Sequence, residues 1–210
     1  MTMLDFDRIA AAVPQQQPYP FAVIECAIPR DPARAIVADF PKIDRPGAVP
    51  LSEAEGGPAF DALLADLTGE RFRAIIAEKF GLDLAGKSIS ANVRGMMRRS
   101  DGNIHTDTGA KLVTVLIYFN EHWPTREGSL RILNNRHDLD DYAAEVPPEL
   151  GTMVLFQVTP DCWHGHTPVS GKRLSMQMNY LSGVERRGKH QWGFRALGKV
   201  RRLFYRPKAA

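Results

Sequence analysis

The sequence predicts an α+β protein in which N-terminal helices pack on one side of a β-sandwich or barrel. In the first third of the chain, apolar residues recur at helical spacing. After Gly86, short runs rich in β-branched residues are separated by clusters of Gly, Pro, Asn and Asp, as is typical of strands. A chain of 210 residues with 44% hydrophobic content suffices for one buried core, with little left for a second.

We therefore expect one domain over residues 1–185. Residues 1–86 should be mostly helical support and residues 87–183 the strand-rich core. Residues 186–210 form a basic C-terminal tail.

The helical part divides into four expected helices. Residues 4–13 read as a short helix ended by Pro14, and residues 31–40 as a helix with Asp31 as N-cap and Pro32 at its first position. Two further helices follow from apolar residues at helical spacing, and Gly81 should end the second. These residues are Phe60, Leu63, Leu64 and Leu67, then Phe72, Ile75, Ile76 and Phe80.

A strand is expected at residues 21–28, and residues 43–55, with their Pro, Gly and polar residues, read as a loop. The core strands are expected at residues 88–98, 112–120, 129–133, 152–157 and 173–181. Residues 134–148 read as an insertion, and its acids Asp138, Asp140, Asp141 and Glu145 as a solvated acidic loop.

The net charge of +3 hides an asymmetry. Nine of the 27 basic residues and no acid lie in residues 186–208, so the remaining 18 face all 24 acids and the body carries about −6. No general attraction to nucleic acid is implied. Residues 193–207 read as a basic amphipathic helix, which either contacts an anionic membrane or an acidic partner, or docks by its apolar face.

Targeting signals and membrane spans are not evident in the sequence. No apolar run approaches the roughly 20 residues of a membrane span, and the N-terminus lacks the pattern of a secretory signal. Cys26 and Cys162 are expected to be reduced thiols. We expect a cytoplasmic protein, peripheral to the membrane if its tail binds there.

The residues most suggestive of chemistry lie in the centre of the chain. His105 and Asp107 are one residue apart, and His164 and His166 follow about a quarter of the chain later. Two histidines and one carboxylate can hold a metal by one face and leave the other positions open, an arrangement suited to non-haem Fe(II). A closed sheet can bring such distant positions together, because neighbouring strands lie about 4.8 Å apart.

The second histidine ligand could be His164 or His166. The spacing to Pro168 and to Arg173, nine residues beyond His164, favours His164 and leaves His166 beside the metal or on the substrate side. Arg173 is placed to hold a carboxylate-bearing cosubstrate, because its planar guanidinium matches a carboxylate. His122, His137 and His190 are expected at the surface.

Residues 102–183 resemble the Fe(II)- and 2-oxoglutarate-dependent dioxygenases, in particular the prolyl hydroxylase-like branch. The features that match, in order, are His105-Thr-Asp107, Leu116-Ile-Tyr118-Phe-Asn120 with Trp123, Glu127-Gly128 through Leu133, Gly151 through Phe156, and Trp163-His164 through Gly171-Lys-Arg173. Together they cover about two-fifths of the chain.

The resemblance implies a double-stranded β-helix, a distorted jelly roll. It implies that His105, Asp107 and His164 bind iron and that Arg173, with Tyr118 and Ser175, binds the C5 carboxylate of 2-oxoglutarate. Iron(II), 2-oxoglutarate and O2 would be required, and ascorbate would stimulate. The reaction would couple decarboxylation of 2-oxoglutarate to succinate with hydroxylation of a peptide or small molecule.

This chain departs from the family in one respect, and two other functions are compatible with its metal ligands. The family tyrosine expected before the first histidine has no clear counterpart here, and Asn92, Arg94 and Met97 are the nearby candidates. The alternatives are a cupin-type metal enzyme that does not use 2-oxoglutarate and a metal-binding sensor without turnover.

Overall fold

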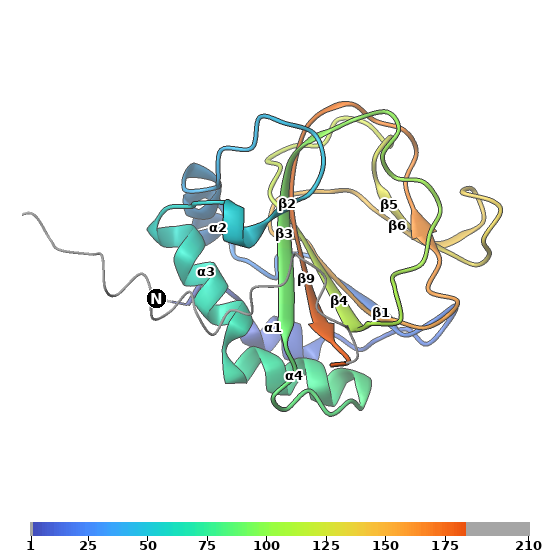
Figure 1. Ribbon diagram of the computed structural model, residues 1–210, viewed down its shortest axis with the longest axis horizontal. Coiled ribbons are helices and arrows are strands. Elements are labelled where there is room, and N and C mark those ends of the chain that lie inside the picture. Colours follow the sequence, from blue (N-terminus) through green and yellow to red (C-terminus); the bar gives the residue numbers. More distant parts are fainter. Residues whose placement is uncertain (1, 184–210) are drawn as a thin grey trace, which may run out of the picture.

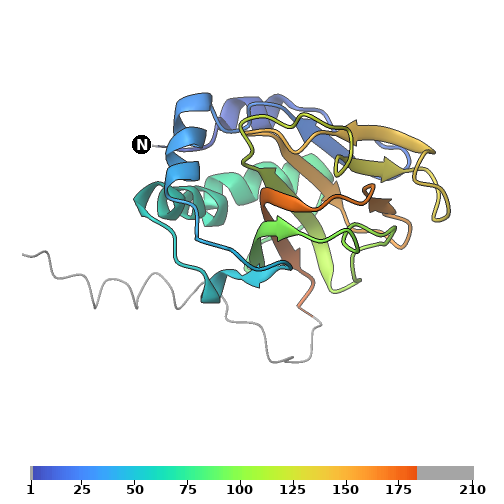
Figure 2. The same ribbon diagram turned by 90° about the horizontal axis from the view of Figure 1, so that it is seen from above.

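The fold was analysed in a computed structural model, which describes residues 2–183. Four α-helices occupy the N-terminal part, and Figures 1 and 2 show α2, α3 and α4 gathered on one side of the strands. The helices are α1 (Phe6–Ala11), α2 (Arg30–Ala38), α3 (Pro58–Thr68) and α4 (Glu70–Phe80).

The strands form two antiparallel sheets. The larger has the order β1-β7-β4-β9-β3-β2 and the smaller the order β6-β5-β8. The strands of the larger sheet are β1 (Phe21–Ile24), β2 (Val49–Pro50), β3 (Ile89–Met97), β4 (Lys111–Tyr118), β7 (Met153–Gln157) and β9 (Gly171–Leu181). Those of the smaller sheet are β5 (Leu130–Leu133), β6 (Tyr142–Val146) and β8 (His164–Gly165). The α+β class and the sandwich expected from the sequence are confirmed.

The helices cover one face of the larger sheet. Alternate residues of each strand point to that face because side chains alternate along a strand. In β9 these are Leu174, Met176, Met178 and Tyr180, which share one apolar core with helix residues such as Leu63 and Ile76. This core fixes the larger sheet as a rigid wall.

The opposite face of the larger sheet faces the smaller sheet. Apolar side chains fill the space between the two sheets along one part of this face only. Under β1, β7 and β4 a second apolar cluster joins the sheets, and it includes Phe21, Phe156, Leu130 and Ile132. Under β3 and β9 the inward positions are polar. They include Asn92 and Arg94 on β3 and Arg173, Ser175 and Gln177 on β9. The sandwich is therefore packed at one side and hollow at the other.

Most helix limits agree with the sequence-based expectation. Gly81 ends α4 in a left-handed conformation (φ +63°), which glycine adopts without steric cost. The expected start of α2 was wrong. The helix begins at Arg30 after an extended Pro29, no side chain caps it, and Asp31 lies in its first turn. At this position the negative carboxylate of Asp31 still interacts favourably with the positive end of the helix dipole.

Two other expectations need correction. The strand expected at residues 21–28 ends at Ile24, because Cys26 takes a positive φ of 53° and turns the chain. The loop expected at residues 43–55 contains the short edge strand β2 and a 3-10 turn at Leu51–Glu53. β2 pairs with β3, so this segment extends the larger sheet.

The expected solvated acidic loop at residues 134–148 was also wrong in part. Residues 142–146 form β6, and Glu145 is largely buried between Arg131 and Arg126. Arg131 makes a second ion pair with Asp140, whose own side chain is 85% exposed. The ion pair between Arg131 and Glu145 thus joins β5 to β6.

The basic tail, including His190, lies outside the described residues. Within residues 2–183, no helix combines the length and the apolar character required to span a bilayer. Cys26 is exposed and Cys162 is buried, and both are free thiols.

Candidate metal centre and cosubstrate cavity

The three predicted metal ligands converge. Metal-binding atoms of His105, Asp107 and His164 all lie within 4.8 Å of one another. His105 and Asp107 come from the segment between β3 and β4, whereas His164 opens β8. The backbones of His105 and His164 form an isolated antiparallel bridge, with an N–H···O bond of 3.0 Å in each direction. These two bonds, with a third from the His166 N–H to the Gly102 carbonyl at 2.9 Å, bring together residues far apart in sequence.

Hydrogen bonds fix which nitrogen of each imidazole can bind a metal. Nδ1 of His105 lies 2.7 Å from the carbonyl of Asn103, and Nδ1 of His164 lies 2.8 Å from the carbonyl of Cys162. A carbonyl oxygen only accepts, so Nδ1–H donates in both rings. The lone pair of each Nε2 is left for a metal, as is usual when a second contact orients a histidine ligand.

The Asp107 carboxylate is held by two side chains that the sequence did not reveal as part of the site. Lys111 donates to one oxygen at 2.7 Å, and the hydroxyl of Thr114 donates to the other. Burial raises the pKa of Asp107, but the charge of Lys111 and the hydrogen bonds from Lys111 and Thr114 outweigh it and lower the pKa overall. Asp107 is therefore ionised and oriented at neutral pH.

In contrast to Asp107, the rings of His164 and His166 are uncharged at neutral pH. Burial, followed by the nearby His105, lowers the pKa of His164 to about 4. Burial, followed by the charge of Arg173, lowers the pKa of His166 to about 4. Only a neutral imidazole can bind a metal, so His164 is ready to do so over the physiological range.

His166 does not belong to the convergent triad. Its Nδ1 donates to the Thr167 carbonyl at 2.8 Å, and its ring lies against Gly102. A Cβ on Gly102 would come within 2.1 Å of the imidazole, and φ there is +89°, so glycine is required on both counts. The structure thus places His166 beside the cavity, and His164 in the triad.

A cavity of about 150 Å³ opens between the two sheets beside the triad. Its lining includes His105 and His164 together with Tyr118, Arg173 and Ser175, the residues predicted to hold 2-oxoglutarate. The side chains expected to bind metal and those expected to bind the cosubstrate therefore border the same space.

Arg173 has unused hydrogen-bonding capacity in this cavity. It is 5% exposed, its Nη2 donates to the Gly128 carbonyl at 3.0 Å, and its Nε has no hydrogen-bond partner among residues 2–183. Its guanidinium carbon lies 5.0 Å from the centre of the Tyr118 ring. Burial raises the pKa of Tyr118, against the opposing charge of Arg173, so the phenol keeps its proton and can donate. A buried donor without a partner is costly, and a carboxylate ligand would satisfy it.

Sequence reasoning missed part of the cavity. Asn92, Arg94 and Met97, left as alternatives for the absent tyrosine, all line it, as does Gln177. A usable signal was present, because polar residues occupy every second position from Arg173 to Asn179 on β9. His122 and His137, expected at the surface, are exposed.

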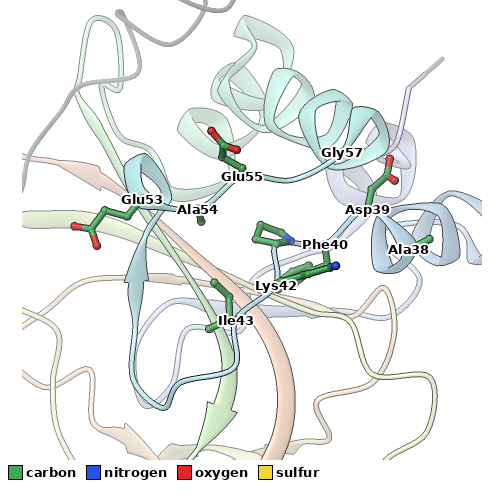
Figure 3. Close-up of a pocket in the computed structure, with 10 residues that line it drawn as sticks. Ala38, Asp39, Phe40, Lys42, Ile43, Glu53, Ala54, Glu55 and Gly57 are labelled. Carbon is green, nitrogen blue, oxygen red and sulfur yellow. The ribbon is translucent and has the colours of Figure 1, made fainter.

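A second, larger hollow of about 540 Å³, drawn in Figure 3, has none of the triad residues in its lining. It is bordered by the segment from Ala38 to Ile43 and by the segment from Glu53 to Gly57. Asp39 there accepts the backbone N–H of Ala59 at 2.7 Å, and Glu53 pairs with Arg45. These acids serve local structure, and none belongs to the metal triad.

Comparison with known proteins agrees with this geometry. The sequence model of the 2OG-Fe(II) oxygenase superfamily matches residues 93–181. No curated protein matches the chain by sequence.

The fold is similar to that of two solved prolyl hydroxylases. One is a prolyl-4-hydroxylase from Pseudomonas putida, with 20% identity, a TM-score of 0.55, and coverage of 87% of this chain and 93% of that one. The other, from Trichoplax adhaerens, was solved with a peptide fragment of the hypoxia inducible factor oxygen degradation domain. It is 16% identical, with a TM-score of 0.50 and coverage of 84% and 88%.

The fold and the triad together define a non-haem iron protein of the jelly-roll class. Residues 93–181 match the 2OG-Fe(II) oxygenase superfamily, and the double-stranded β-helix expected from the resemblance is confirmed. This match and the His/Asp/His triad support an Fe(II)- and 2-oxoglutarate-dependent oxygenase.

Thr114→Val should weaken metal binding while leaving the fold intact. The change removes the hydroxyl that orients Asp107 and keeps the side-chain shape. Loss of such an orienting contact typically lowers metal affinity about 10- to 100-fold. Titration with Co(II) measures the effect, and Thr108→Val, an exposed threonine of the same segment, is the control. Equal affinities in wild type and Thr114→Val would contradict this role.

The metal-free protein should lose stability as the pH falls from about 6.5 to about 4. In this window the unfolded chain protonates its histidines, whereas native His164 and His166 stay neutral, so protons favour unfolding. His166→Asn keeps a donor for the Thr167 carbonyl and should make the decline shallower. Urea unfolding at several pH values tests this, with exposed His137→Asn as control. An unchanged slope would show that His166 does not contribute.

Proposed function

We propose that His105, Asp107 and His164 bind Fe(II) on one face, and that Arg173 with Tyr118 and Ser175 holds the far carboxylate of 2-oxoglutarate. The observation that carries this proposal is the position of Arg173, a buried cation that lines the cavity that the triad borders. A keto-diacid with one carboxylate at Arg173 would extend its other end toward the triad.

Each protein group has a defined task in this arrangement. Iron, when bound, supplies the activation of O2 and the oxidation of a C–H bond. Arg173 contributes a permanent charge, and Tyr118 a neutral donor. Lys111 and Thr114 orient Asp107, while Asn103 and Cys162 orient the two imidazoles. The apolar cluster under β1, β7 and β4 fills the neighbouring part of the space between the sheets.

The primary substrate is proposed to be a peptide or a small molecule. The Trichoplax neighbour was solved with a peptide fragment, which supports the peptide class. The basic tail is proposed to add contact with an anionic membrane or an acidic partner, and sedimentation with anionic liposomes at low and high salt would test it. The cytoplasmic location stays a prediction.

Asp107→Ala and His164→Ala should each abolish formation of succinate from 2-oxoglutarate. Each change removes one of three metal ligands. The assay measures succinate with Fe(II), with and without ascorbate, and circular dichroism checks folding. Succinate at the wild-type rate in either variant would exclude the proposed iron site. Oxygen uptake by the wild type that does not respond to 2-oxoglutarate would favour a cupin-type enzyme instead.

Arg173→Ala should raise the concentration of 2-oxoglutarate required for half-maximal rate by about 10- to 150-fold. A charge-assisted hydrogen bond contributes about 1.5–3 kcal/mol, which corresponds to that range. Lys172→Ala, its exposed neighbour, is the matched control. An unchanged requirement in Arg173→Ala would remove this residue from the cosubstrate site.

A further inference from the structure

A second arginine borders the cavity, and the proposed function does not use it. Arg94 lies on β3, directly opposite Ser175 of β9, and Ser175 in turn pairs with Tyr118 of β4. Residues paired across antiparallel strands point to the same face, so Arg94, Ser175 and Tyr118 form one row on the inner face. All three line the cavity.

Arg94 makes no direct contact with an anionic group among residues 2–183, and Asp101 is the acid whose charge acts on it. Within residues 2–183 it makes no side-chain hydrogen bond and no ion pair shorter than 4.0 Å, although Asp101 also borders the cavity. Burial lowers the pKa of Arg94, Asp101 opposes this, and the charge of Arg173 lowers it further. A half-buried guanidinium beside a second cation is unfavourable unless an anion joins it.

Arg173 and Arg94 reach the cavity from different sides. Arg173 leans toward Gly128 and the Tyr118 ring, on the β4 side of β9. Arg94 enters from β3, on the other side of β9. One carboxylate held by Arg173 therefore leaves Arg94 for a second anionic group.

Arg94 also lies away from the metal ligands along the strands. Asp107 is bound by Thr114, which pairs with Asn179, whereas Arg94 pairs with Ser175. Four residues of strand separate these rows, or about 13 Å. The carboxylate of 2-oxoglutarate nearest the metal is thus a poor match for Arg94, because that end would lie at the triad.

The groups around Arg94 are polar as well. The adjacent row of the same face places Asn92 opposite Gln177, and both amides line the cavity. Amides beside a guanidinium suit a small carboxylate, since each contributes N–H donors.

We propose that Arg94 binds a carboxylate of the primary substrate, so that the substrate is a small carboxylic acid and is selected by its charge. This inference rests on the proposed function, because it assigns the substrate side of the same cavity.

Ligand-observed NMR on the full-length protein loaded with Zn(II) and 2-oxoglutarate tests the proposal. The probes are the N-acetyl forms of the common amino acids, each compared with its carboxamide. The carboxamides of aspartate and glutamate retain a side-chain carboxylate and distinguish that source from a free C-terminal carboxylate. We expect at least one acid to bind at least tenfold more tightly than its uncharged amide, and Arg94→Gln to lose that preference.

Exposed Arg99→Gln is the control and should keep the preference. Three results would overturn the proposal: no acid binds, acids and uncharged amides bind equally, or Arg94→Gln retains the preference. A loss of 2-oxoglutarate affinity of more than tenfold in Arg94→Gln would also overturn it, by assigning Arg94 to the cosubstrate. Failure of the wild type to bind 2-oxoglutarate at all would count against the proposed function itself.

Discussion

The active centre depends on one backbone pairing, between His105 and His164. Two hydrogen bonds of 3.0 Å join these residues, and their imidazole rings lie 4.3 Å apart between centroids. Together with the hydrogen bond from the His166 N–H to the Gly102 carbonyl at 2.9 Å, this bridge holds the segment before β4 against β8, a strand of two residues that also pairs with β5. The pairing fixes the backbone, and the carbonyls of Asn103 and Cys162 then fix the orientation of each ring.

The hollow side of the sandwich is made possible by the packed side. The helices and the outer face of the larger sheet bury one extensive apolar core, and β1, β7 and β4 bury a second against the smaller sheet. These cores stabilise the fold in large part through burial of apolar surface. The inward positions of β3 and β9 can therefore carry polar and charged side chains, at a cost that a protein lacking those cores could not tolerate.

The sequence predicts the parts of this structure that local patterns determine, and it does not predict the parts that depend on tertiary contacts. The outer face of β9 and the helices α3 and α4 follow regular apolar periods, so they were predictable, and several motifs in order identified the triad and Arg173. β8 was not predictable, because its two residues form a strand only by tertiary pairing. Glu145 is buried because it pairs with Arg131 of the neighbouring strand. Lys111 contacts Asp107 because its side chain is directed toward the residue four positions earlier in the chain. Local sequence patterns contain neither of these contacts.

The ammonium group beside Asp107 has a consequence for the electrostatic balance of the centre. The negative charge of that carboxylate is already matched by Lys111, and imidazoles coordinate without charge of their own. A divalent cation placed there would keep both of its positive charges uncompensated by the protein. A keto-diacid would offset one of these charges, because its other carboxylate would be matched by Arg173.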